Sequence, residues 1–280
     1  MKTAQKIQIA RAAYRAVHLG RTIIGQSDRC VVTRNGMTYD LDLSQGIDFA
    51  IYLGDIFERS TRAALRRLVS PPALVLDVGA NIGAHTLHLA KFVGPHGRVL
   101  AFEPTDFAFR KQARNLALNP ELAQRVIAYQ CFLAAEDGAP VPGSIYSSWP
   151  RVEAANGHAK HLGHEMPTKS ARARSLDSVL SEQGDARVQL VKLDVDGFEC
   201  EILRGASTLL QVSKPIFVME LAPYVLVERG TSLDELLSFF IPNGYRFYDE
   251  RRERPLPSTA AGLQKLIADG ESINVIARAN

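Results

Sequence analysis

Short apolar segments alternate with amphipathic segments from residue 73 to the end of the sequence. The apolar segments are nearly continuous, which is typical of strands buried on both faces, and the segments between them have the spacing of helices. A strand, a helix and a second strand form the repeating unit of a parallel sheet covered by helices. The pattern predicts an α/β fold with seven strands, and these read ALVLDVG, RVLAFEP, RVIAYQCFLA, RVQLVKLDV, PIFVMEL, YRFYDE and SINVIARA.

The predicted sheet is doubly wound and mostly parallel. The last two strands have no clear long helix between them, so an antiparallel strand is expected at that edge. The helices expected between the other strands read AHTLHLAKFVG, TDFAFRKQARNLALN, FECEILRGASTLLQ and SLDELLSFFIPNG.

Residues 1–50 are predicted to form an extension that precedes a single domain at 51–280. A helix is expected over 1–20, and a hairpin over 30–43, because Asn35-Gly36 suits a type I′ turn between alternating arms. A helix over 54–69 should stop before the two prolines that follow it. The first helix is expected to pack on the domain or on a second subunit, which suggests a homodimer, and membrane-surface binding is the alternative.

Residues 138–174 fit no regular element, because glycine, proline and serine interrupt the pattern. Long insertions of this kind in a compact domain are usually functional, so this one is expected to face the substrate. Tyr146 and Trp149 in it are candidates to stack on a sugar ring, with loop anchoring as the alternative.

Composition narrows the class of protein. The net charge of +3 does not favour a nucleic-acid partner. The cysteines Cys30, Cys131 and Cys200 form no paired motif, which is typical of reduced thiols in a cytoplasmic protein. No apolar run approaches transmembrane length, so no transmembrane helix is expected. No signal peptide is expected either, because the first twenty residues lack its continuous apolar stretch.

A glycine-containing turn, LDVGANIG, joins the first domain strand to its helix. Gly79 and Gly83 permit a sharp turn and the close approach of a ligand to the backbone. The spacing differs from the Gly-x-Gly-x-x-Gly fingerprint of dinucleotide sites, which disfavours a nicotinamide dehydrogenase. A plain strand-to-helix junction is the alternative reading.

Glu103 ends the second domain strand, 24 residues after Gly79. A carboxylate at this place can accept hydrogen bonds from the ribose hydroxyls of an adenosine-type cofactor. The alternative is a carboxylate that only favours the following helix N-terminus. Turn and acid together predict a nucleoside-cofactor site.

The sequence resembles the FkbM family of S-adenosylmethionine-dependent methyltransferases over about residues 50–280. The resemblance is carried, in order, by VLDVGANIGAHTLHLA, VLAFEPTDFAFRKQARNLALN, SLDSVL, LVKLDVDGFECEILRGASTLL and PIFVMEL. It implies a class I methyltransferase (Rossmann-like) fold and O-methylation of a sugar, glycolipid or natural-product scaffold.

The resemblance also implies roles for particular residues. The family usually shows Lys-x-Asp-x-Glu-Gly around Asp194, whereas this chain has Asp196 in place of the glutamate. Asp194 would lie beside the reacting methyl group, and Glu58, with surface charge as the alternative, near the amino-acid end of the cofactor. The remaining implied cofactor contacts are the turn residues Asp77, Gly79, Ala80, Asn81 and Gly83, the ribose-side residues Glu103 and Pro104, and the adenine-side residues Ala134, Ala135 and Glu136.

An alcohol acceptor needs a base to remove its proton during methyl transfer. Asp194 is the first candidate, with a carboxylate bonded to the following turn as the alternative. Glu220, which ends the fifth strand, is the second candidate, and a strand-end hydrogen bond is its alternative. The two carboxylates are also candidate Mg²⁺ ligands, although no third ligand is evident. Asp196 is expected to cap the helix that starts at Gly197 or Phe198, and Glu199 to lie in its first turn.

His158, His161 and His164 follow one another at three-residue intervals in the insertion. A zinc site would need a rigid frame and a further ligand, and no cysteine lies nearby. His164 is therefore a candidate substrate contact or base. The alternative is that all three histidines are solvated loop residues.

The alternatives to the expected O-methyltransferase are an enzyme that methylates a nucleic acid or a protein, and a binding module that keeps the cofactor pocket without catalysis. The sequence has no Asn/Asp-Pro-Pro-aromatic motif and no Pro-Cys nucleophile, which disfavours nucleic-acid methylation.

Overall fold

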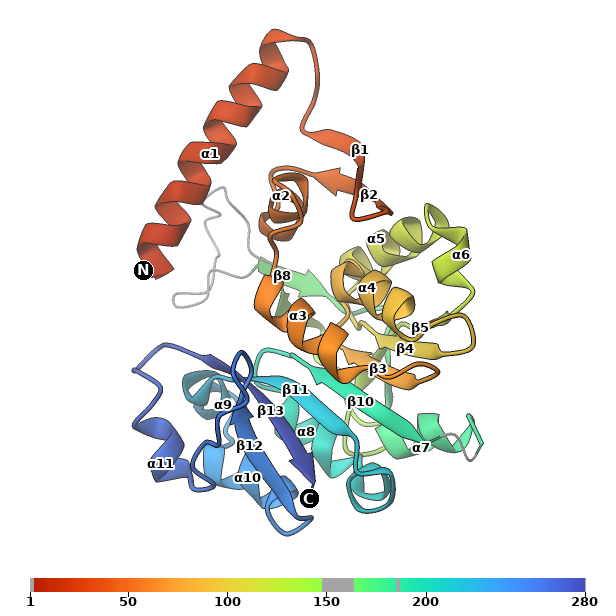
Figure 1. The fold of residues 1–280 in the computed structure, drawn as a ribbon, viewed down its shortest axis with the longest axis vertical. Coiled ribbons are helices and arrows are strands. Elements are labelled where there is room, and N and C mark those ends of the chain that lie inside the picture. Colours follow the sequence, from red (N-terminus) through yellow and green to blue (C-terminus); the bar gives the residue numbers. More distant parts are fainter. Residues whose placement is uncertain (1–2, 148–163, 185–186, 280) are drawn as a thin grey trace.

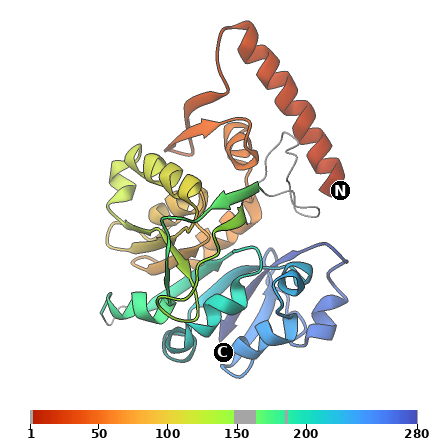
Figure 2. The same ribbon diagram turned by 180° about the vertical axis from the view of Figure 1, so that it is seen from behind.

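The computed structural model describes residues 3–147, 164–184 and 187–279. A seven-stranded sheet forms its centre, in the order β12-β13-β11-β10-β3-β4-β5 (Figures 1 and 2). The strands are β3 (Leu74–Val78), β4 (Arg98–Phe102), β5 (Val126–Tyr129), β10 (Val188–Leu193), β11 (Ile216–Leu221), β12 (Tyr245–Asp249) and β13 (Ile273–Ala279).

The direction of the strands confirms the predicted doubly wound sheet. β5, β4, β3, β10 and β11 pair in parallel, and β13 is antiparallel to both of its neighbours, β11 and β12. The antiparallel strand therefore lies second from the edge, and β12 is the edge strand. The strand order reverses between β3 and β10, which is where doubly wound sheets bind their ligands.

Helices cover both faces of the sheet (Figures 1 and 2). Alternate residues of a strand face opposite sides, so Leu76 and Val75 of β3 belong to two different apolar clusters. The first cluster includes residues of α8 and α10, and the second includes residues of α3 and α4. The helices of the domain are α3 (Arg59–Leu68), α4 (Ala84–Phe92), α5 (Asp106–Ala117), α6 (Pro120–Ala123), α7 (Leu176–Ser181), α8 (Glu199–Arg204), the π-helix η1 (Leu209–Ser213), α9 (Pro223–Glu228), α10 (Leu233–Phe240) and α11 (Ala260–Gln264).

The N-terminal part contains the helix and hairpin that the sequence predicts. It consists of α1 (Thr3–Ile23), β1 (Arg29–Arg34), β2 (Met37–Asp42) and a further helix, α2 (Gly46–Tyr52). The hairpin turn has the two positive φ angles of a type I′ turn, 52° at Asn35 and 80° at Gly36.

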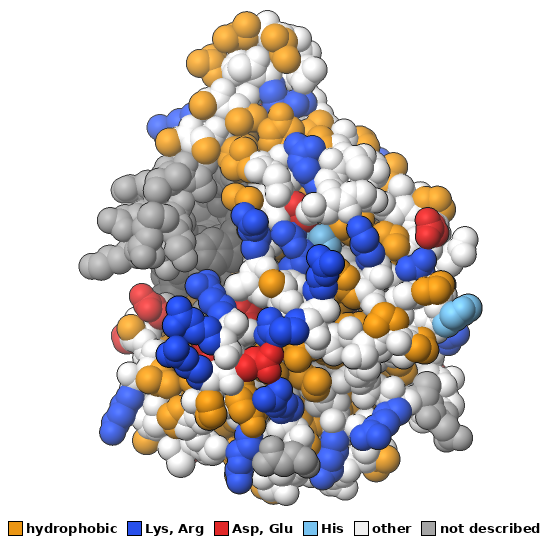
Figure 3. Space-filling model, in the orientation of Figure 1, with side chains coloured by type: hydrophobic (Ala, Val, Ile, Leu, Met, Phe, Trp, Pro, Cys, Tyr) orange, Lys and Arg blue, Asp and Glu red, His pale blue; other side chains and the backbone are white. Residues whose placement is uncertain are grey.

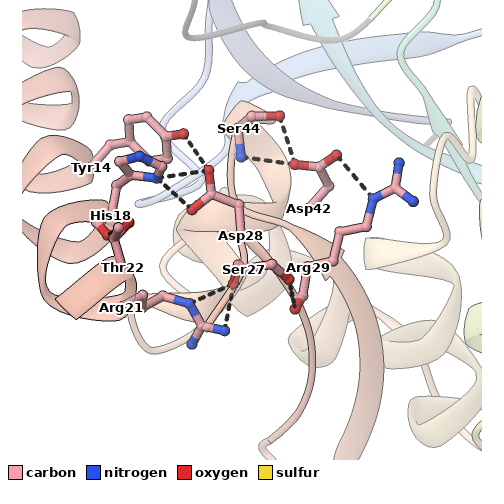
Figure 4. A network of polar contacts seen from close by, with 9 residues as sticks. All are labelled: Tyr14, His18, Arg21, Thr22, Ser27, Asp28, Arg29, Asp42 and Ser44. Carbon is pink, nitrogen blue, oxygen red and sulfur yellow. Dashed lines mark hydrogen bonds and ion pairs between the residues drawn. The ribbon is translucent and has the colours of Figure 1, made fainter. Parts of the chain in front are cut away.

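Side-chain hydrogen bonds fasten α1 to the hairpin (Figure 4). Asp28 accepts a hydrogen bond of 2.6 Å from the Tyr14 hydroxyl, and His18 Nδ1 lies 2.9 Å from its Oδ1. Arg21 Nε donates to the Ser27 carbonyl oxygen at 2.9 Å. These bonds fix the direction of α1, which projects from the body of the molecule in Figure 1.

The extension shares an apolar core with the domain. Tyr39, Leu41 and Phe49 of the extension are fully buried in one cluster with Ile82 and Leu87. No described strand extends the β1-β2 pair. Instead, two asparagine side chains of the domain bond the β2 backbone.

Of these two asparagines, Asn115 lies in α5, and Asn119 is the N-cap of α6. Asn119 accepts from the Thr38 N–H at 2.9 Å and donates to the Thr38 carbonyl at 2.6 Å, and Asn115 accepts from the Asp40 N–H at 2.9 Å. Backbone groups that a neighbouring strand would otherwise satisfy are thus paired with side chains of the domain.

Two predicted helices have boundaries in the structure that differ from those expected from the sequence. The helix expected over 54–69 begins only at Arg59, because Gly54, Asp55 and Glu58 have positive φ angles. The helix expected after β10 stops at Arg204, where a Cβ on Gly205 would lie 2.3 Å from the Ala134 carbonyl oxygen. Close packing of the backbone, which no local pattern reveals, ends this helix.

The strand expected over RVIAYQCFLA divides into two. β5 ends at Tyr129, and β6 (Cys131–Leu133) leaves the main sheet to pair in parallel with β9 (Arg172–Arg174). The interpretation of 138–174 as irregular throughout is wrong, because β7 (Ser144–Ser147) and β8 (His164–Pro167) form an antiparallel pair within it. Trp149, His158 and His161 lie outside the described residues. Among the described helices, none combines the length and apolarity needed to cross a membrane.

Replacing Leu41 with alanine should test whether the extension and the domain unfold together. Leu41 is 1% exposed within the shared cluster, so truncation should lower the free energy of unfolding by ~2–5 kcal/mol. Urea denaturation should show one transition with a lower midpoint. Val31→Ala, at a position 59% exposed in the other hairpin strand, should change the stability by less than ~0.5 kcal/mol. Separate transitions for the extension and the domain would contradict the shared core.

Candidate active site

The carboxyl ends of four neighbouring strands bring the main candidate residues into one row. Val78 of β3 pairs with Phe102 of β4 and with Leu193 of β10, which in turn pairs with Met219 of β11. The next residue along each strand is therefore Glu103, Gly79, Asp194 or Glu220, in that order across the sheet. Residues that are up to 141 positions apart in the sequence thus share one edge.

Gly79 lies at the closest approach between β3 and β10. It has a φ angle of 77°, and a Cβ at this position would lie 1.9 Å from the carbonyl oxygen of Asp194. The N–H groups of Gly79 and Ala80 both donate to the Phe102 carbonyl oxygen, at 3.1 and 2.9 Å. Only glycine satisfies both the angle and the contact, so the turn is fixed by backbone sterics.

The turn continues through Asn81 to Gly83, which precedes α4. Asn81 has a φ angle of 48°, and its side-chain oxygen accepts from the Ile82 N–H at 2.8 Å. Gly83 has a φ angle of 85° and donates to the Ala80 carbonyl oxygen at 2.9 Å. Asparagine tolerates the left-handed region because its short side chain can bond the local backbone.

Glu103 is 3% exposed and fixes the turn to the end of β4. Its Oε2 accepts from the Asn81 N–H at 2.9 Å, and its Oε1 accepts from the N–H and the hydroxyl of Thr105, at 2.9 and 2.5 Å. Pro104, which lies between Glu103 and Thr105 in the sequence, is half-buried. Burial raises the pKa of Glu103, although these hydrogen bonds oppose the rise.

Lys192 supplies the cation that carboxylates at the mouth of an apolar strand require. Its side chain is 5% exposed, and its ammonium lies 3.2 Å from Asp194 Oδ2 and 3.8 Å from Asp77 Oδ1. It also donates to the Gly79 carbonyl oxygen at 3.1 Å. Burial lowers the pKa of Lys192, but the surrounding carboxylates outweigh burial and raise it overall. The signal in the sequence was a lysine inside an otherwise apolar strand.

Asp77 is the penultimate residue of β3 and is fully buried. Its Oδ2 accepts from the Thr86 hydroxyl at 2.6 Å. Its Oδ1 has no hydrogen-bond partner among the described residues. The Lys192 ammonium, 3.8 Å from this oxygen, is the cation that faces it.

Three carboxylates that form no ion pair with Lys192 hold protons more tightly than usual. Desolvation, followed by the charge of Asp194, raises the pKa of Glu220 to about 8, and Glu220 accepts a hydrogen bond from the Ser272 hydroxyl. Desolvation and neighbouring carboxylates also raise the pKa values of Asp196 and Glu199 to about 7. Acidic groups are thus crowded at the row of strand ends, and burial and mutual repulsion favour the protonated forms of these three.

The interpretation of Asp196 as a helix cap is wrong. α8 begins at Glu199, and its N-cap is Phe198, which makes no side-chain cap bond. Asp196 has a φ angle of 49° and precedes the cap by two residues, because the chain turns once more before the helix begins. Glu199 does lie in the first turn, but it is buried, at 6% exposed.

Glu58 reaches the same edge from the residue before α3. Its Oε2 lies 2.8 Å from Nε2 of His85, a buried residue of α4. Burial alone would raise the pKa of Glu58, but the hydrogen bond and charge of His85, together with the charge of Lys192, lower it overall. The side chain is 34% exposed, so Glu58 is a half-buried, paired carboxylate and not a surface charge.

Other candidate residues make contacts elsewhere. The Ala134 N–H donates to the carbonyl oxygen of Arg174, and the Ala135 N–H donates to Glu201 at 3.1 Å, while Glu136 is exposed. Their adenine contact stays a prediction. The backbone of His164 lies in β8, and its side chain is outside the described residues.

The described residues do not support the expected Mg²⁺ site. No group of three or more histidine, cysteine, aspartate or glutamate side chains among them is arranged to hold a metal ion. Of the two candidate ligands, Asp194 is paired with Lys192 and Glu220 accepts from the Ser272 hydroxyl.

Replacing Lys192 with methionine should destabilise the protein by ~3–5 kcal/mol, because it leaves the buried Asp77 carboxylate without its cation. Chemical denaturation measures this loss. Lys91→Met, at an exposed lysine, is the matched control and should have little effect. Adding Asp77→Asn to Lys192→Met should recover part of the loss. Full stability of Lys192→Met would show that Lys192 does not compensate these carboxylates.

Comparison with known proteins agrees with this geometry. A family model described as "Methyltransferase FkbM domain" matches residues 77–247, which is more than half of the chain. The chain is 26% identical over 223 residues to methyltransferase sdnD of Sordaria araneosa, covering 68% of this chain and 85% of that protein. It is 30% identical over 147 residues to methyltransferase 1 of Beauveria bassiana, covering 48% of this chain and 58% of that one.

Solved structures give weaker likenesses. A methyltransferase FkbM from Methylobacillus flagellatus has 16% identity and a TM-score of 0.45, covering 75% of this chain and 44% of that one. An S-adenosylmethionine-dependent O-methyltransferase from Thermotoga maritima has 13% identity and a TM-score of 0.43, covering 93% of this chain and 81% of that one. The fold therefore rests on the strand order of this chain itself.

The matched span begins at Asp77, below the glycine turn, and ends in β12, so it includes every strand end of the row. The chain belongs to the FkbM methyltransferase family.

Proposed function

We propose that this chain transfers a methyl group from S-adenosylmethionine to a hydroxyl group of a sugar, glycolipid or natural-product scaffold. The observation that carries the proposal is the corner formed by Gly79 and Glu103, where a glycine-containing turn lies beside a buried carboxylate. This corner stands at the reversal of strand order, where a nucleoside would lie across the strand ends.

The charges of the row suit the proposed cofactor. S-adenosylmethionine supplies an electrophilic methyl group on a sulfonium and carries an ammonium group as well. Glu58, whose pKa is lowered, and Asp194, paired with Lys192, supply carboxylates near this edge, and Glu220 can lose its proton when a positive charge arrives. A positively charged ligand is favoured where carboxylates already repel one another.

Glu220 is the stronger candidate for the general base. Asp194 forms an ion pair with Lys192 at 3.2 Å, so its carboxylate is already bound to a cation of the protein. Glu220 has a pKa raised to about 8, which brings it near the pH at which a general base is most effective. In this proposal Glu220 removes the proton of the acceptor hydroxyl, and Asp194 with Lys192 positions the end of β10.

The proposed acceptor side is the segment 138–174. Its hairpin, β7 with β8, carries Tyr146, and the half-buried ring of Tyr146 suits contact with a sugar or a flat scaffold. The class of acceptor itself comes from the family resemblance, and the side chain of His164 remains a candidate contact.

The division into an extension, 1–50, and a domain, 51–280, is part of the same proposal. We propose homodimerisation through the tip of the extension, where Leu19, Ile23 and Ile24 are exposed. Figure 3 shows hydrophobic side chains at this tip, where α1 ends. Cytoplasmic localisation is proposed because all three cysteines are free thiols.

Glu103→Gln should weaken the binding of S-adenosylhomocysteine by roughly 10- to 100-fold, because a charged hydrogen-bond acceptor of the ribose is lost. Isothermal titration calorimetry measures the affinity. Glu121→Gln, at a carboxylate whose side chain is 87% exposed, is the matched control and should bind normally. Binding of NAD instead of S-adenosylhomocysteine by the wild type would refute the proposed cofactor.

Glu220→Gln should lower kcat by ~10²- to 10⁴-fold while changing the affinity for S-adenosylhomocysteine little. In the wild type, kcat/KM should rise with pH to a plateau above about 8, because the base acts only after it has lost its proton. A screen of labelled methyl transfer to sugars, glycolipids and polyketides, with and without EDTA, identifies the acceptor. The same assay then measures kcat and kcat/KM on that acceptor. Asp194→Asn is the comparison variant, and a larger loss of kcat there would transfer the role of the base to Asp194. Cofactor binding without turnover on any acceptor would favour a non-catalytic module.

A further inference from the structure

A small cavity lies between the N-terminal extension and the glycine turn. Gln45, Ile47 and Asp48 line it from the extension, and Asn81, Phe107 and Lys111 line it from the domain. The cavity adjoins the proposed cofactor corner, because the N–H of Asn81 donates to Glu103 Oε2 and Phe107 lies four residues after Glu103. The carboxylate row at Asp194 and Glu220 does not line it.

Two residues of the extension that line this cavity each carry a buried acceptor atom without a hydrogen bond among the described residues. Asp48 is 1% exposed, and its Oδ2 pairs with the Lys111 ammonium and accepts from the Asp42 N–H at 2.6 Å. Its Oδ1 has no hydrogen-bond partner among the described residues, and neither has Oε1 of Gln45. Buried acceptors are normally satisfied, so two such atoms around one cavity indicate that a donor belongs there.

Glu103 cannot by itself hold both hydroxyls of a ribose in this arrangement. A carboxylate has about four acceptor positions, two on each oxygen. Thr105 occupies Oε1 through its N–H and its hydroxyl, and Asn81 occupies one position on Oε2. One position remains, on the Oε2 that accepts from the cavity-lining Asn81, whereas a ribose offers two hydroxyl donors.

We propose that Gln45 and Asp48 of the extension accept the second ribose hydroxyl of the nucleoside cofactor. The cavity is small enough to suit a hydroxyl group, and Ile82 and Phe107 supply apolar wall beside the polar atoms. Lys111 keeps the other oxygen of Asp48 occupied, so Oδ1 is left to face a donor. This inference rests on the proposed function, and it makes the extension part of the cofactor site.

Gln45→Met is the most direct test, because it removes one acceptor and leaves the Asp48–Lys111 ion pair intact. Calorimetry should compare S-adenosylhomocysteine with its 2′-deoxy and 3′-deoxy analogues. The variant should bind S-adenosylhomocysteine roughly 5- to 50-fold more weakly than the wild type does. It should bind one of the two deoxy analogues as well as the wild type does, because that analogue lacks the hydroxyl in question.

Asp48→Asn is the second variant. It should also bind S-adenosylhomocysteine more weakly, and it should bind the same deoxy analogue as well as the wild type does. Gln26→Met, at an exposed glutamine of the extension, is the matched control and should bind all three ligands normally. Unchanged affinity of Gln45→Met for S-adenosylhomocysteine would overturn the inference and leave the proposed function standing. Equal weakening for all three ligands would also overturn it, since a general distortion of the site would then be the cause. Failure of the wild type to bind S-adenosylhomocysteine would overturn both.

Discussion

The Lys192 ammonium allows several carboxylates to occupy one edge of the sheet. It lies within 4 Å of Asp194 and Asp77 and bonds the carbonyl oxygen of Gly79, so one charge joins β3 to β10 at the point where their backbones come closest. Without a cation, burial of Asp77 beside Asp194 would combine desolvation with repulsion, and either effect alone is unfavourable. The position of the turn and the charge of the site therefore depend on the same residue.

One ammonium does not neutralise the whole row. The pKa values of Asp196, Glu199 and Glu220 rise because these groups share a desolvated edge with Asp194. A ligand that brings positive charge to this edge would favour their ionised forms, so its binding and the release of protons are thermodynamically linked. For a methyltransferase this linkage has a direct use, since arrival of the positively charged cofactor would prepare a neighbouring carboxylate to accept a proton.

The extension is joined to the domain by polar contacts that continue the shared apolar core. Asn115 and Asn119 replace a neighbouring strand along β2, and Lys111 pairs with Asp48 beneath the turn that carries Asn81. Because α5 supplies the bonds to the hairpin and begins just after Glu103, the same helix fixes both the hairpin and one side of the proposed cofactor corner. This arrangement explains why Gln45 and Asp48 of the extension line one cavity with Asn81 of the glycine turn.

The sequence by itself determined the order of strands and helices, the hairpin at Asn35-Gly36, and the placement of Gly79, Glu103, Asp194 and Glu220 at strand ends, because each of these follows from local periodicity and turn chemistry. Contacts between distant segments decided the rest. After Tyr129 the chain leaves the main sheet, and β6 pairs with β9, some 40 residues further along the sequence. Asp196 does not cap α8, because the backbone makes one more turn before the helix begins. The burial of Asp48 against Lys111 likewise depends on two elements 63 residues apart meeting in space. Only the tertiary structure brings such groups together, since burial and charge pairing depend on distances that no local pattern of residues specifies.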